Sequence, residues 1–253
     1  GIAFSLANLG DSHIVLGNWR QAREYLVRGI EVSQSVGASW FEPYPLLSLG
    51  RLQTLRGEWD EARLTLEEGI RLAERNRDPQ ALRHGSVPLA QLDMAEENPE
   101  AAVERLERLT DRIELEQPDA AEMLILLAQA HLAAGNIARA EAILLDVVGS
   151  TREEGSDLYL AEALRVQGML WTQQERREQA RTALEEALEL ARAMPYPYLE
   201  AQILFEYGTL HARKDEPVQA QQRFEEALVI FRRLGAENDT QRTERVLAQH
   251  RRK

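Results

Sequence analysis

Five histidines, together with three pairs of adjacent glutamates that recur at one spacing, are the residues of this sequence that could carry chemistry. An imidazole can bind a metal ion or move a proton near neutral pH. Two carboxylates can act as general acid and general base when they face each other across a cleft. The candidates are His13, His84, His131, His211 and His250, with Glu67–Glu68, Glu185–Glu186 and Glu225–Glu226. Whether any of them meet depends on the elements that carry them.

Motifs for covalent, phosphate-binding or metal-dependent reactions are missing from the sequence. It has no cysteine, which excludes disulfides, thiol nucleophiles and cysteine-based zinc sites. None of the patterns GxxxxGK[ST], GxGxxG or HExxH occurs. We therefore predict that the protein is not an enzyme and needs no cofactor and no metal.

Charge and hydropathy exclude two further classes of protein. Thirty basic residues against 42 acidic ones give a formal net charge of −12. This balance argues against direct nucleic-acid binding, because phosphates must be neutralised by a basic surface. No apolar run is long enough for a membrane span, and no signal peptide is recognisable. Together with the missing cysteines, these features predict a cytoplasmic protein.

A repeat of about forty residues dominates the chain. Adding forty to the positions of Leu9, Gly10, Gly17, Trp19, Ala22, Leu26, Gly29 and Ile30 gives Leu49, Gly50, Gly57, Trp59, Ala62, Leu66, Gly69 and Ile70. Six copies share an alanine at one position, namely Ala22, Ala62, Ala102, Ala140, Ala180 and Ala220. A second position is glycine or alanine, and a third is large and apolar, so we expect close helix approach at the small residues.

Each copy predicts two helices, because apolar residues recur at helical spacing in two segments separated by a short break. No alternation typical of a strand competes with this pattern. The sequence therefore predicts an all-α fold of about 13 helices in a single domain over residues 1–253. The predicted repeats cover about 3–38, 39–78, 79–116, 119–155, 157–195 and 197–235, followed by a capping helix at 238–250.

The repeat also decides how the chemical candidates are interpreted. His13, His131 and His211 occupy the same position of copies one, four and six, so they would lie far apart in a stack and pack between helices. Adjacent glutamates on a helix point in different directions. We therefore interpret the Glu pairs as a solvated outer face.

The order of small, aromatic and large residues in each copy resembles the tetratricopeptide-repeat (TPR) pattern over the whole chain. This resemblance implies a right-handed superhelical solenoid of antiparallel helix pairs. The long repeats resemble the sensor arm of the maltose-regulon activator and other STAND-type bacterial signalling ATPases. The resemblance thus implies a role in signal transduction or transcription regulation.

In TPR proteins the first helix of each pair lines a concave groove, so the resemblance also implies a binding stripe. Aligned on that stripe, the predicted groove residues are Phe4, Asp11, Tyr44, Leu47, Arg51, Gln91, Met94, Gln129, Arg165, Met169, Gln173, Phe205, Arg213, Arg242 and Arg245. The N-terminal half of this stripe is apolar and aromatic, and four arginines gather in the C-terminal half. Because arginine recognises carboxylates and phosphates, we predict a ligand with an apolar part and an acidic part. The alternative is that these arginines pair with neighbouring acids such as Glu162 or Glu206.

Two functional hypotheses follow from these observations. The first is the C-terminal sensor or interaction arm of a larger bacterial signalling ATPase or transcription regulator, which binds a protein, a peptide or a small effector. The chain begins inside a repeat without a polar cap, so this hypothesis expects a covalently linked N-terminal domain. The second is a free-standing adaptor that scaffolds a protein complex. A helical-repeat enzyme lacks any supporting group of residues.

Overall fold

The computed structural model describes residues 1–35, 37, 40–110 and 120–250. Within these residues every regular element is an α-helix, and no strand is present. The thirteen helices are α1 (Ile2–Val15), α2 (Trp19–Ser35), α3 (Pro43–Arg56), α4 (Trp59–Asn76), α5 (Pro79–Ala95), α6 (Pro99–Thr110), α7 (Ala120–Ala133), α8 (Ile137–Glu153), α9 (Asp157–Gln173), α10 (Arg177–Ala193), α11 (Pro197–Arg213), α12 (Pro217–Leu234) and α13 (Glu237–His250). The predicted all-α fold of about 13 helices is confirmed.

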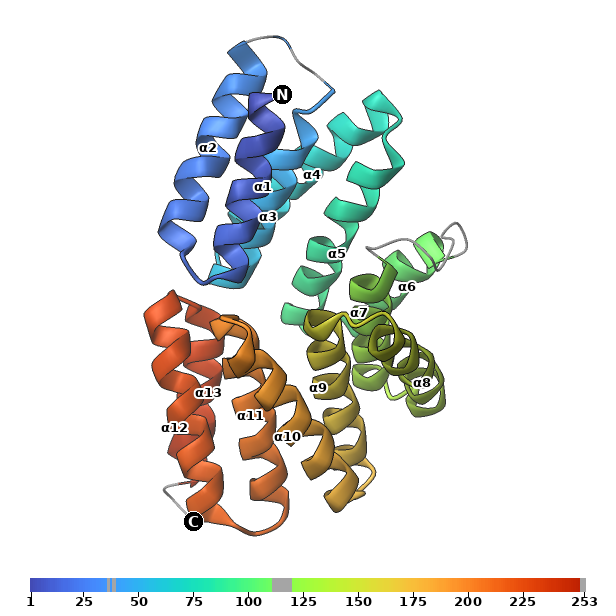
Figure 1. Cartoon of the computed structure of the whole chain (residues 1–253), viewed down its shortest axis with the longest axis vertical. Helices are drawn as coiled ribbons and strands as arrows, with labels where there is room; N and C mark the ends of the chain where they lie inside the picture. Colours follow the sequence, from blue (N-terminus) through green and yellow to red (C-terminus); the bar gives the residue numbers. More distant parts are fainter. Residues whose placement is uncertain (36, 38–39, 111–119, 251–253) are drawn as a thin grey trace. The chain divides into compact units, whose positions relative to one another are not determined.

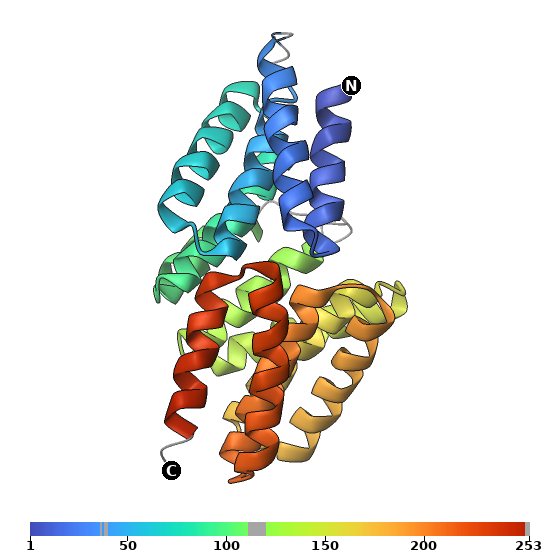
Figure 2. The same ribbon diagram turned by 90° about the vertical axis from the view of Figure 1, so that its left-hand side faces the viewer.

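The helices form two compact units, Gly1–Leu126 and Leu127–Lys253. In the first unit, α1 packs on α2, α3 on α4 and α5 on α6, and the first helices α1, α3 and α5 contact one another in order (Figure 1). In the second unit, α9 packs on α10 and α11 on α12, and α13 covers α12 (Figure 2). Each unit is thus a stack of helix pairs. That all six repeats form one continuous domain stays a prediction.

Glycines on the first helices let the two helices of a pair approach closely. A Cβ atom added to the glycine would lie 2.4 to 2.7 Å from a large side chain sixteen residues later. The pairs are Gly10 with Leu26, Gly50 with Leu66, Gly168 with Leu184, and Gly208 with Phe224. All four large side chains are buried. The predicted register of small against large residues is therefore confirmed at these four pairs.

The turn between the two helices of a pair has one residue in the left-handed conformation. Glycine supplies it at Gly17, Gly57 and Gly135, with φ of 75°, 81° and 81°. The same position is filled by Glu97, Glu175 and Asp215, each with φ of 60°. Left-handed backbone costs a side-chain-bearing residue roughly 1–2 kcal/mol. The packing of the helix pair therefore imposes this turn even where the local sequence disfavours it.

Among the described residues, no helix is both long enough and apolar enough to cross a membrane.

Candidate functional site

A buried arginine on α9 is the centre of the most unusual polar site in the second unit. Arg165 is only 7% exposed. Its Nη2 donates a hydrogen bond to Oε1 of Gln129 at 2.9 Å, and its Nη1 lies 3.4 Å from Sδ of Met169. Its Nε has no hydrogen-bond partner. Among the described residues no acidic side chain forms an ion pair with Arg165, so its direct contacts are neutral groups, while the Asp239 carboxyl interacts with its charge electrostatically.

Helices α11 and α13 supply the neighbouring side chains. The guanidinium carbon of Arg242 lies 4.2 Å from the centre of the Phe205 ring, a cation–π distance. Nη2 of Arg242 is 4.0 Å from Oε1 of Glu206, which is 8% exposed. The alternative pairing with Glu206 therefore holds, at long range, for Arg242 and not for Arg165.

A tyrosine–aspartate pair completes the site. The hydroxyl of Tyr198 donates to Oδ2 of Asp239 at 2.9 Å. Burial raises the pKa of the Asp239 carboxyl, against the opposing effects of the Tyr198 hydrogen bond and of the Arg242 and Arg165 charges. Burial also raises the pKa of Tyr198 well above its usual value. Both arginines are thus close enough to act on this pair electrostatically.

We call this set of residues the Arg165 cluster: Gln129, Arg165, Met169, Tyr198, Phe205, Glu206, Asp239 and Arg242. Sequence reasoning missed Tyr198 and Asp239. The available signal was helical spacing, because Asp239 lies three residues before Arg242 on α13 and therefore on the same face.

The remaining predicted groove residues of the second unit lie outside this cluster. Arg213 is exposed and its Nη1 donates to the carbonyl of Thr172 at 3.4 Å. Gln173 is exposed. Arg245 is exposed, and its Nε donates to the carbonyl of Gln241 on its own helix at 3.4 Å. The prediction of Phe205 as a surface residue is wrong, because its ring is buried against Phe224 and only 6% exposed.

In the first unit the first helices of the pairs carry aromatic rings at one end. The Phe4 ring lies 5.7 Å from Tyr44 and 5.8 Å from Phe41, measured between ring centres. Tyr44 also lies 6.2 Å from the ring of His84. Its hydroxyl donates to Oδ2 of Asp78 at 3.0 Å. These contacts tie α1, α3 and the start of α5 together.

Further along the same helices the predicted stripe becomes polar. Nη2 of Arg51 is 3.0 Å from Oε1 of Glu122. Oδ1 of Asp11 and Oε1 of Gln91 are buried without a hydrogen-bond partner. Met94 is partly exposed.

Leu47 corrects the predicted stripe in the first unit. It is fully buried in the core that α3, α4 and α5 share, and its side chain closes on Gly69 and Gly85. Its prediction as a groove residue is wrong, because at this point the neighbouring helices approach closely enough to cover it.

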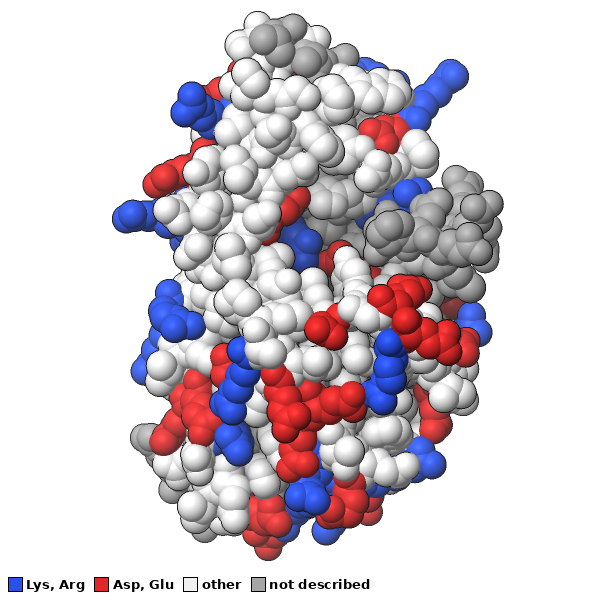
Figure 3. Space-filling model, viewed as in Figure 1, with Lys and Arg blue, Asp and Glu red and all other residues white. Residues whose placement is uncertain are grey.

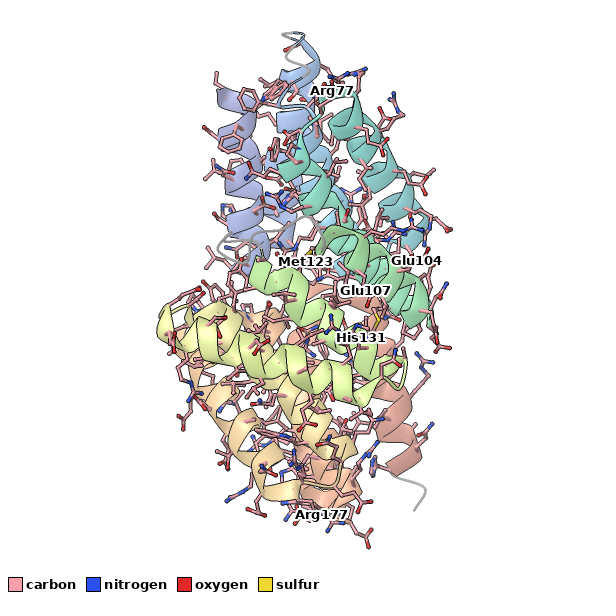
Figure 4. All side chains as sticks on the ribbon, turned by 90° about the vertical axis from the view of Figure 1, so that its right-hand side faces the viewer. Arg77, Glu104, Glu107, Met123, His131 and Arg177 are labelled. Carbon is pink, nitrogen blue, oxygen red and sulfur yellow. The ribbon has the colours of Figure 1, made fainter. Side chains whose placement is uncertain are left out.

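The repeated histidines pack against the turns of their helix pairs. Nδ1 of His211 and Oε2 of Glu216 are 2.6 Å apart, and this hydrogen bond lowers the pKa of Glu216. His131, labelled on α7 in Figure 4, is buried, and its Nδ1 lies 3.5 Å from Nδ2 of Asn136. Among the residues that the structure describes, no three potential ligands come together as a metal site requires.

Most of the paired glutamates are exposed, as predicted for an outer face. Glu67, Glu68, Glu185 and Glu225 are exposed on second helices, while Glu186 and Glu226 are partly exposed. Two other acids of a second helix, Glu104 and Glu107 on α6, are exposed as well (Figure 4). On the face drawn in Figure 3, uncharged side chains dominate over α1 to α3, whereas acids and bases interleave over α9 to α11.

Like Tyr198, two further tyrosines are expected to ionise late in an alkaline titration. Burial, together with hydrogen bonds to Asp78 and Glu185, raises the pKa of Tyr44 and of Tyr207 to about 12. Because the folded pKa lies above the ordinary 10.0, the folded state retains protons that the unfolded state loses. Their contribution to stability is therefore complete below pH 10 and is lost as the pH rises towards 12.

Phenolate absorbance measured against pH checks this expectation. Tyr44→Phe and Tyr207→Phe should each remove one late-ionising group and leave the ordinary tyrosines unchanged. Ionisation of both residues near pH 10 in the folded protein would contradict the hydrogen bonds described above.

Comparisons with known proteins agree with this architecture. A tetratricopeptide-repeat family model matches residues 87–154, and the model of anaphase-promoting complex subunit 5 matches residues 12–96. A search of the curated proteins finds no significant match.

Solved structures share the fold at low sequence identity. BtubC (BKLC) from P. vanneervenii is 16% identical with a TM-score of 0.59, over 84% of this chain and 90% of that one. The apo form of RapI is 11% identical with a TM-score of 0.62, over 99% and 71%. A STAND protein with a tetratricopeptide repeat sensor from Pyrococcus horikoshii is 11% identical with a TM-score of 0.61, over 98% of this chain and 42% of that protein.

The repeat and these matches define a TPR-like helical-repeat protein. Such a scaffold is typically non-catalytic, and it is the fold of a protein-interaction module. The resemblance to TPR proteins seen in the sequence is thereby confirmed.

Proposed function

We propose that this chain binds a protein or peptide segment on the inner faces of its first helices. The observation that carries the proposal is the charged Arg165, which is buried on α9, has no ion pair within the described residues and has an Nε without a hydrogen-bond partner. A charge that costs free energy to bury and gains no ion pair does not contribute to stability in the usual way. A group that arrives from outside the chain would supply the missing hydrogen-bond acceptor.

The wider inner face supports the same proposal. In the first unit, the buried acceptors of Asp11 and Gln91 also lack partners within the chain. Phe4, on the same helix as Asp11, is more than a third exposed. Unsatisfied hydrogen-bonding groups beside exposed aromatic surface are typical of recognition surfaces.

Selection of displayed random peptides on the purified chain tests this function. The double variant Arg213→Glu, Arg242→Glu reverses two charges on the proposed binding face of the second unit. Arg177→Glu combined with Arg233→Glu makes the same change of charge on second helices. Selected peptides should lose at least about tenfold in affinity for the first variant and bind the second normally. Equal binding to both variants would place the binding surface elsewhere.

We further propose that the module is the sensor or interaction arm of a larger signalling protein. The similarity to a STAND protein with a tetratricopeptide repeat sensor supports this role, and this chain spans less than half of that protein. The reading frame upstream of Gly1 provides the test. A P-loop ATPase or an output domain encoded there is the expected result, and a start codon directly before Gly1 would favour a free-standing adaptor.

A further inference from the structure

One face of α1 carries exposed apolar side chains in a regular order. Ile2, Leu9 and Leu16 are 71%, 44% and 41% exposed, and the exposed Ser5 and Ser12 lie between them. Because these five residues are spaced by three and four positions, they form one stripe along the helix. Leu16 directly follows α1 and keeps right-handed helical backbone, so the stripe runs along the whole helix. We call these residues the Leu9 stripe.

The matching face of a later first helix is buried. Leu89 and Leu92 on α5 stand where copy one has Leu9 and Ser12, and both belong to the core that α5 shares with α3 and α4. They are only 4% and 0% exposed. Within the part of the chain that the structure describes, nothing covers the Leu9 stripe in this way.

The Leu9 stripe nevertheless differs from the face that joins two repeats. Ser12 stands where copies two and three have the fully buried Leu52 and Leu92. A repeat packed across α1 would therefore meet a small side chain in place of a leucine, and a cavity would remain. The Ser12 hydroxyl donates to the carbonyl of Asn8 on its own helix at 2.8 Å, so it needs no partner from another chain. Small residues between large ones instead suit the close approach of a single helix.

We infer that the Leu9 stripe is the contact through which two copies of this chain associate, with their α1 helices antiparallel. Large and small residues alternate along the stripe in an order that is the same in both directions, so the stripe is complementary to its own copy turned by a two-fold axis. Leu9 of one copy would pack between Ser5 and Ser12 of the other, and Ile2 would pack against Leu16. Two-fold contacts of this kind are the commonest in soluble oligomers.

Charge favours the same occupant. The chain has a net charge of −12, so two copies repel each other over much of their surfaces. The exposed residues of α1 include no charged side chain, and its single acid, Asp11, is partly buried. Figure 3 accordingly shows a broad uncharged surface over α1. Two acidic chains can therefore meet at α1 without bringing like charges together.

Sedimentation equilibrium of the full chain over a wide range of concentrations tests the inference. We expect a monomer–dimer equilibrium that shifts towards the dimer as salt is added, because salt screens the repulsion and leaves the apolar contact in place. Leu9→Glu should raise the dissociation constant at least about tenfold. Leu64→Glu, the same change at a leucine of α4 that is 70% exposed, is the matched control and should dimerise normally. Circular dichroism should show equal helix content in both variants.

Single cysteines test the antiparallel arrangement, since the chain contains none of its own. Ser5→Cys and Ser12→Cys should each stay unlinked alone and form a disulfide when mixed, because linked residues must have Cα atoms within about 7 Å. Linking of either variant to its own copy, or no linking at all, would overturn the antiparallel pairing. A monomer at every concentration, or unchanged association of Leu9→Glu, would overturn the whole inference and leave the stripe to a further repeat or another protein.

Discussion

Replacing Leu184 by alanine is expected to lower the free energy of unfolding by about 2–5 kcal/mol. Leu184 is fully buried on α10, and its Cγ would lie 2.6 Å from a Cβ added to Gly168 on α9. The alanine therefore leaves a cavity between α9 and α10. Such cavities are costly because the surrounding structure relaxes only in part.

Whether replacing Gly168 by alanine raises or lowers the free energy of unfolding depends on the residue at position 184. In the wild-type chain the new methyl overlaps Leu184, and overpacking costs typically 1–3 kcal/mol. In the Leu184→Ala background the same methyl occupies part of the cavity and also favours the helix. Gly168→Ala should therefore destabilise the wild type and stabilise the Leu184→Ala variant. A double-mutant cycle measures this coupling directly.

Urea denaturation of the full chain, followed by circular dichroism, is the measurement. The matched control is Gly149→Ala on α8, where the added Cβ has no atom within 4 Å apart from its chain neighbours and the backbone of its own helix. It should stabilise the chain by roughly 0.5–1 kcal/mol, because alanine is the better helix former. If Gly168→Ala behaved like Gly149→Ala in the wild type, the close packing of α9 on α10 would be refuted.

The second large effect is expected at Arg165, where charge and size can be changed separately. Arg165→Glu places a buried carboxylate near Glu206 and Asp239, with no cation directly paired to it. By analogy with buried pairs that lose one partner, we expect a loss of about 3–5 kcal/mol in the free energy of unfolding. The repulsion comes from groups that lie on α11 and α13, so unfolding should begin in the second unit.

Arg165→Met is the informative counterpart. A buried charge replaced by an apolar side chain of similar length is often neutral or stabilising. We expect Arg165→Met to retain the stability of the wild type, which chemical denaturation measures. A strong destabilisation by Arg165→Met would show that the guanidinium is a structural element and not a recognition element.

Much of this architecture could be read from the sequence because it depends on local periodicity. The helical spacing of apolar residues and the repeat of about forty residues predicted about 13 helices, and the described residues form thirteen. The pairing of small with large residues also followed from the repeat, since Gly168 and Leu184 recur at the same offset as Gly50 and Leu66. These features recur in successive copies, so each copy confirms the others.

The candidate site was only partly predictable. The stripe rule selected Gln129, Arg165, Met169 and Arg242, which the structure brings into one cluster. It could not show that Leu47 and Phe205 are buried. Burial depends on how closely neighbouring helices approach, and the spacing along one helix does not contain that distance.

The sequence by itself thus determined the helical class of the fold and the pairing of the helices. Only the tertiary structure decided which arginines form ion pairs. Arg242 lies near Glu206, whereas Arg165 is buried beside amide and sulfur groups. The difference arises because an ion pair needs two side chains from separate helices within about 4 Å, a condition that helix packing sets and residue spacing does not.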